Sequence, residues 1–275
     1  MASRRLISQR HKDRVVEAAR QLLERAGISG PPVDPRNLAP LQGIVDIEEA
    51  PLGRTDAQLT PGPSGFTISV NAFASPQRKN FSIAHEIAHT FFQPAVKSYR
   101  NGANFVGKGT SLEHDAEEAL CDVAAAEMLM PEHWFRRAAS AERPSIATVQ
   151  QLASSFDTSL EATALRYARL QPHPVQVTVW KRRYRRIQPK WNGGSKVFSV
   201  RPFEFRHPES YIEFSVAEAY LGNHPVARQE VELSCYPPQR IWFQGQGFRH
   251  GSGRYVLSLM QSAFSPNTHM MKGGA

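Results

Sequence analysis

The sequence predicts an α+β protein in which a helical part with a small sheet precedes a strand-rich region. Before residue 171, apolar residues recur at helical spacing in several segments. Two short segments in the same part have the composition of strands. From Pro172 onward, aromatic and β-branched residues come in short runs that Gly, Pro and Asn interrupt. The 275 residues suffice for one large domain or two modest ones.

The N-terminal part begins with an amphipathic helix and continues into the two strand segments. In residues 13–26 apolar side chains recur at helical spacing, and Gly27 follows as a stop signal. Strands are predicted over residues 43–51 and 65–72, the second of which alternates apolar and polar residues. Because residues 59–65 read LTPGPSG, we expect a turn between the strands.

Two longer helices follow, and a loop separates them. Ser75 and Pro76 are typical of a helix start, which predicts a helix from there to about Phe92. Residues 93–111 show no clear period and are predicted to form a loop. The next helix covers about 112–130, with acidic residues in its first turns, where the helix dipole favours them.

Three short helices are predicted next, and the residue composition then changes at Pro172. The short helices precede Pro172, and two of them have the rhythm of a helix-turn-helix. Few basic residues accompany that rhythm, so packing on the core or contact with a substrate explains these helices better than DNA binding. The expected parts are an N-terminal domain (1–131), a short-helix region (132–171), a strand-rich basic C-terminal domain (172–264) and a disordered tail (265–275).

Charge and cysteine content restrict the class of protein. Residues 172–275 hold 14 basic and 6 acidic residues, so the net charge of +8 belongs to this region alone. Such an excess is typical of polyanion binding or of a solvated basic face. The two cysteines form no disulfide framework, and no apolar run has the length of a membrane span or a signal peptide. We therefore expect a cytoplasmic protein.

The predicted helix 76–92 carries a motif that indicates a metal site. His85, Glu86 and His89 form H-E-x-x-H among apolar residues, where ionisable groups are costly unless they are paired or bound to a metal. Histidines four residues apart share one helix face, and both can reach one Zn²⁺ at about 2.0–2.1 Å. Glu86 would then accept a proton from a metal-bound water as it attacks a carbonyl.

A catalytic zinc normally has three protein ligands, so the acidic helix 112–130 is expected to supply the third. Glu117 and Glu118 are both candidates for the third ligand, and they lie on adjacent faces of the helix. Glu118 is favoured because Asp122, one turn later, would accept a hydrogen bond from a ligand histidine. Cys121 is a further candidate, although a buried, inert thiol is the simpler interpretation. Spacing alone leaves these alternatives open.

Taken together, these motifs resemble the ImmA/IrrE metallopeptidases. The resemblance rests on ISVN, on Arg78 with FSIAHEIAHTFF, and on EALCDVAAAEMLMP, and it covers roughly residues 10–171. It implies a thermolysin-like zincin core with Zn²⁺, or another divalent metal such as Mn²⁺, held by His85, His89 and Glu118. Glu86 is implied as the general base. The sequence departs from the family pattern at Asn80, where a second arginine is common, and at Asp122, where asparagine is usual.

The resemblance also implies a biological role. Family members are typically bacterial regulators that cleave a helix-turn-helix repressor and switch on stress or mobile-element genes. We therefore expect a site-specific endopeptidase with a protein substrate and no membrane partner. A protease of a toxin–antitoxin or phage-related module would share this chemistry. The alternative is a non-proteolytic zinc-containing regulator whose C-terminal domain binds nucleic acid or a signal ligand.

The segment 180–191 is the main feature of the basic region. It interleaves aromatic residues with basic ones, a composition typical of nucleic-acid binding. The ordinary interpretation is an exposed strand whose aromatic residues pack. The candidate nucleic-acid or partner contacts are Lys181, Arg182, Arg183, Arg185 and Arg186.

Overall fold

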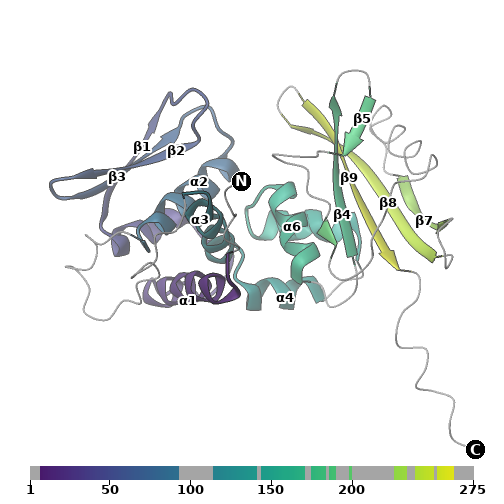
Figure 1. Ribbon diagram of the computed structural model, residues 1–275, viewed down its shortest axis with the longest axis horizontal. Coiled ribbons are helices and arrows are strands. Elements are labelled where there is room, and N and C mark those ends of the chain that lie inside the picture. Colours follow the sequence, from purple (N-terminus) through teal and green to yellow (C-terminus); the bar gives the residue numbers. More distant parts are fainter. Residues whose placement is uncertain are drawn as a thin grey trace, which may run out of the picture. The chain divides into compact units, whose positions relative to one another are not determined.

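The structure is a computed structural model, and its helices and strands confirm the α+β class (Figure 1). It describes residues 7–92, 114–140, 144–170, 175–183, 186–189, 198–199, 226–233, 239–250 and 253–262. The chain divides into two compact units, the first comprising 1–135 with 153–162 and the second 136–152 with 163–275. The predicted short-helix region therefore contributes to both units. The predicted loop 93–111 and the tail from 265 lie outside the described residues.

Unit 1 contains a three-stranded sheet that supports the motif helix. Its strands are β1 (Ile44–Ala50), β2 (Ala57–Gly62) and β3 (Gly65–Asn71). β3 is central; it pairs in parallel with β1 and antiparallel with β2, which is an edge strand. Ile68 and Val70 of β3 are fully buried. They belong to the hydrophobic core of this unit, together with residues of the helices.

The predicted turn over 59–65 is wrong for most of its length. Residues 57–62 form β2, with Leu59 opposite Ile68, and only Pro63 and Ser64 connect the two strands. Proline is tolerated in an edge strand because its missing N–H costs no ladder hydrogen bond there. The proline and glycine content that indicates a turn is thus compatible with this strand.

Three helices of unit 1 pack on one another, and one of them also packs on the sheet. α1 (Gln9–Arg25) packs on α3 (His114–Leu129), and α2 (Pro76–His89) lies between α3 and the sheet (Figure 1). Ser75 caps α2 by accepting a hydrogen bond from the backbone N–H of Arg78, as the sequence predicts. Glu127 of α3, only 1% exposed, forms an ion pair with Arg20 of α1 at 2.9 Å. A buried carboxylate is thereby paired.

The remaining elements are short helices and a second sheet. Two 3-10 helices, η1 (Pro35–Asn37) and η2 (Ala39–Gln42), precede β1. The three predicted short helices are α4 (Glu132–Ser140), α5 (Ile146–Ser155) and α6 (Leu160–Leu170). The strands of the second sheet are β4 (Val175–Arg183), β5 (Arg186–Pro189), β6 (Phe198–Ser199), β7 (Val226–Leu233), β8 (Gln239–His250) and β9 (Gly253–Ser262). Their order is β5-β4-β9-β8-β7, with β6 beside β4, and all their pairings are antiparallel. None of the helices in the described parts of the chain has the length and apolar character of a membrane span.

We expect that replacing Tyr167 by phenylalanine stabilises the protein. Tyr167, on α6, is fully buried, and its hydroxyl has no hydrogen-bond partner among the described residues. An unsatisfied buried polar group costs about 1–3 kcal/mol, so Tyr167→Phe should raise the free energy of unfolding by about 1 kcal/mol. Tyr167→Ala should instead lower it by about 3–5 kcal/mol, because it leaves a cavity. Urea denaturation of both variants tests this, and a less stable phenylalanine variant would contradict it.

Candidate metal centre

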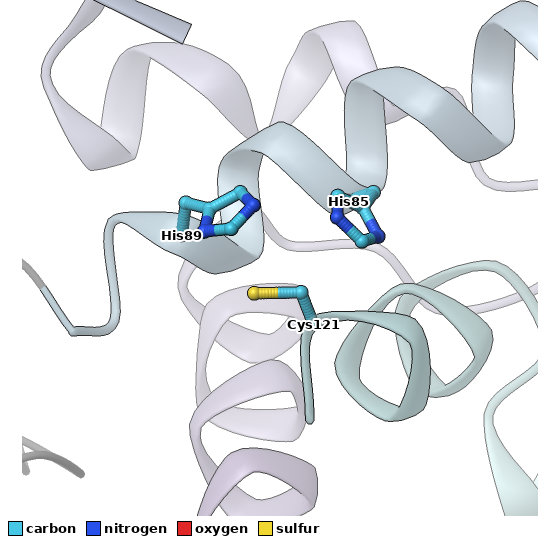
Figure 2. Close-up of side chains that lie close together, drawn as sticks. All are labelled: His85, His89 and Cys121. Atoms are coloured by element: carbon cyan, nitrogen blue, oxygen red, sulfur yellow. The ribbon is translucent and has the colours of Figure 1, made fainter. Parts of the chain in front are cut away.

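The motif histidines lie on the face of α2 that meets α3. The neighbouring residues Ile83, Ala84, Ile87 and Ala88 are fully buried and fix how α2 lies in unit 1. His85 and His89 are one turn apart, with ring centroids 5.0 Å from each other and side chains 16% exposed. Figure 2 shows both imidazoles beside the side chain of Cys121, which belongs to α3. The structure therefore places two histidine donors together in a nearly buried position.

One carboxylate of α3 faces both histidines. Oε2 of Glu118 lies 3.1 Å from Nε2 of His85, and Oε1 lies 3.3 Å from Nε2 of His89. The two Nε2 atoms and the carboxylate thus converge on one position. Two imidazoles and one carboxylate are a donor set of catalytic zinc sites, so the residues present fit such a metal ion.

The opposite ring nitrogens face two other carboxylates of α3. Oδ1 of Asp122 lies 3.0 Å from Nδ1 of His85, and Oε1 of Glu117 lies 3.1 Å from Nδ1 of His89. Burial lowers the pKa of His85, but the hydrogen bond and charge of Asp122, with the charges of Glu86 and Glu118, outweigh it, so the pKa is raised. The sequence predicts a contact of Asp122 with a ligand histidine, without specifying which one. The contact of Glu117 with His89 is not predicted from the sequence.

Glu86 lies beside this cluster, on the side of α2 that faces the sheet. Burial raises the pKa of its carboxyl, while the charges of His89 and His85 oppose the shift and that of Glu118 adds to it. The carboxylate also accepts a hydrogen bond from the backbone N–H of Leu59 on β2. Glu86 is thus a carboxyl whose pKa lies above its ordinary value, as general acid–base groups require.

Cys121 of α3 also lies close to the two histidines and offers a sulfur donor. A nitrogen of His85, a nitrogen of His89 and the Cys121 sulfur all lie within 4.8 Å of one another. The Cys121 side chain is completely buried, and burial followed by the carboxylate charges of α3 raises the pKa of the thiol far above its ordinary value. Glu118 already presents a carboxylate oxygen to each Nε2 atom, at 3.1 and 3.3 Å, so it is the better placed of the two donors.

Contacts that the sequence does not predict hold the first turn of α2. Gln77 and Asn80 donate hydrogen bonds to Asp157, at 2.9 and 3.3 Å, and Arg36 donates to the side-chain oxygen of Asn80 at 3.0 Å. Asp157 lies between α5 and α6 and has a left-handed backbone, with φ of 47°. Asn80 therefore has a defined place in this sequence although the family commonly has arginine there. The two contacts with Asp157 link residues about 80 positions apart.

The basic candidates of the C-terminal region belong to the second sheet or to its connections. Lys181, Arg182 and Arg183 lie on β4, and Arg186 begins β5. Arg183 is the register partner of Arg186 in the antiparallel pairing of these strands. Arg185 lies outside the described residues. Their proposed contact with nucleic acid or a partner stays a prediction.

Comparisons with known proteins agree with this geometry. The family model of the IrrE N-terminal-like domain matches residues 43–167. The radiation response metalloprotease IrrE of Deinococcus radiodurans is 32% identical over 133 residues, which are 48% of this chain and 39% of that protein. The chain thus matches about two fifths of the length of that relative. A transcriptional regulator of Mycobacterium tuberculosis has a similar fold, with a TM-score of 0.62 at 20% identity over 91% of this chain and 76% of that chain.

Proposed function

Residues 43–167 belong to the ImmA/IrrE metallopeptidases, and on this premise we propose that the protein is a zinc-dependent endopeptidase. In this proposal His85, His89 and Glu118 hold the metal, and Glu86 is the general base. The convergence of two Nε2 atoms on the carboxylate of Glu118 carries the assignment. Mn²⁺ is the alternative metal, since carboxylate and imidazole donors also accept it.

The chemistry divides between the metal and Glu86. Bound zinc supplies a Lewis acid that polarises a carbonyl and lowers the pKa of water to about 7. Glu86 takes up a proton at its carboxylate and delivers it to the leaving amine; its raised pKa suits both steps. Asp122 holds the ring of His85 through Nδ1, and this contact supports the role predicted for it.

The proposed substrate is a helix-turn-helix repressor in the cytoplasm, cut at one site to switch on stress or mobile-element genes. The name of the Deinococcus relative, a radiation response metalloprotease, supports both a peptidase and a stress response for that protein. A regulator of this kind needs a narrow substrate range. The basic strands of the C-terminal region would contribute a contact with nucleic acid or a signal ligand.

Metal content and cleavage together test the proposal. We expect purified protein to contain one zinc per chain and to cut a helix-turn-helix repressor of its own genome, beginning with any encoded beside this gene. Mass spectrometry of the products should show a single scissile bond. A chelator should abolish the cut, and stoichiometric zinc should restore it. Zinc-free protein that cleaves at the full rate would overturn the metal assignment.

A further inference from the structure

Glu117 lies at the metal centre in a position that differs from that of the three proposed ligands. Its Oε1 is 3.1 Å from Nδ1 of His89, whereas the Nε2 of the same ring faces Glu118 at 3.3 Å. One imidazole cannot offer both nitrogens to a single metal ion. With Nε2 directed at the metal, Glu117 therefore faces the nitrogen that carries the ring proton.

The two histidines are held in the same way. Each has Nε2 toward Glu118 and Nδ1 toward a separate carboxylate, which is Asp122 for His85 and Glu117 for His89. A carboxylate that accepts the second N–H of a ligand histidine fixes its tautomer and raises its basicity. The pair of contacts supplies this support to both ligands.

The helix geometry explains why adjacent glutamates have different partners. His85 meets Asp122, while His89, further along α2, meets Glu117, which is earlier on α3; the helices therefore run antiparallel here. The four-residue step on α2 spans about 6 Å and the five-residue step on α3 about 7.5 Å, at about 1.5 Å per residue. Successive side chains point about 100° apart, so Glu118 faces both Nε2 atoms and Glu117 faces the outer nitrogen of His89.

We propose that Glu117 is the positioning residue of His89: it accepts the Nδ1 hydrogen and thereby directs the Nε2 lone pair to the metal. The proposal rests on the zinc-peptidase function proposed above. Glu117 itself does not bind the metal and does not transfer a proton. Its side chain is 30% exposed, and solvent therefore partly screens the charge of its carboxylate. Its effect on His89 comes through the hydrogen bond.

The test compares three substitutions in the full chain. Glu117→Leu removes the acceptor at similar size, Glu117→Gln keeps an acceptor oxygen without the charge, and Asp115→Asn changes an exposed acid of the same helix as a control. Zinc affinity is measured by competition with a chromophoric chelator. We expect Glu117→Leu to raise the Kd about 10–100-fold, Glu117→Gln to recover most of that loss, and the control to leave the Kd unchanged.

A second measurement separates positioning from general structural damage. In zinc-loaded protein, long-range proton–nitrogen spectra report which ring nitrogen of each histidine carries hydrogen. Glu117→Leu should shift the Nδ1 signal of His89 and speed the exchange of its proton, while the signals of His85 stay in place. Equal changes at both histidines, with a lower Tm of the metal-free variant, would show a structural role and overturn the proposal.

The result also distinguishes this inference from the function on which it rests. If wild-type protein binds zinc and cleaves, but Glu117→Leu has the wild-type Kd and wild-type His89 signals, only the role of Glu117 is wrong. If wild-type protein binds no zinc, the proposed function is wrong and the role of Glu117 is wrong with it.

Discussion

Glu86→Gln is expected to lower the rate of peptide cleavage by about 10²–10⁴-fold while the zinc content stays at one per chain. General acid–base catalysis contributes rate factors of this size, and the amide cannot take up the proton. Glu86 stands beside both histidines, whose charges lower the pKa of its carboxyl against the larger effect of burial. It is placed to act on the reaction without holding the metal.

The measurement is single-turnover cleavage of the repressor, with zinc determined in the same sample. Glu24→Gln, at an exposed glutamate of α1, is the matched control and should cleave at the wild-type rate. Because amide and carboxyl have nearly the same size, the metal-free variant should keep the wild-type Tm. A Glu86→Gln protein with full activity would remove Glu86 from the mechanism, and one that lost its zinc would make it a metal-holding residue instead.

Helical periodicity predicts the parts of this centre that repeat along a helix. His85 and His89 share a face because they are four residues apart, and the same spacing joins Glu118 to Asp122. In the structure these four side chains lie close together. Both helices were recognisable from the sequence because their apolar positions and start signals are strong.

Glu117 shows where periodicity stops being informative. When the acidic helix is considered alone, Glu117 and Glu118 are alternatives for the third metal ligand, because adjacent residues of a helix point in different directions. The antiparallel packing of α2 on α3 gives each a separate nitrogen. This outcome depends on the position of the second helix, which the sequence of the first does not contain.

Two other features of the structure could not be predicted from the sequence, for related reasons. β2 has the proline and glycine content of a turn, and its pairing with β3 becomes visible only in the sheet. The hydrogen bonds of Gln77 and Asn80 to Asp157 join residues about 80 positions apart. Local patterns describe elements, whereas contacts of this range depend on how the elements pack.

Glu118→Gln is expected to raise the Kd for zinc more than about 100-fold. Loss of a residue that only hydrogen-bonds a ligand raises the Kd by about 10–100-fold, and loss of a ligand should cost more. Wild-type protein at a zinc concentration of 1,000 Kd gains about 4.1 kcal/mol of stability by mass action, and this gain should largely disappear in the variant. The amide can still hydrogen-bond both Nε2 atoms, so the metal-free variant should keep the wild-type Tm. Differential scanning calorimetry with and without zinc measures both effects.

Cys121 provides the decisive comparison for Glu118, because its sulfur lies within 4.8 Å of a ring nitrogen of each histidine. We expect Cys121→Ser to bind zinc like wild type, since the carboxylate of Glu118 already faces both Nε2 atoms and completes a set of three ligands. Asp115→Asn, on the same helix as Glu118, should also leave binding unchanged. If Glu118→Gln still bound zinc tightly and the double variant Glu118→Gln with Cys121→Ser did not, the thiol would be the third ligand. The carboxylate of Glu118 would then face the histidines only in the metal-free protein, and the proposed set of ligands would be wrong at that one position.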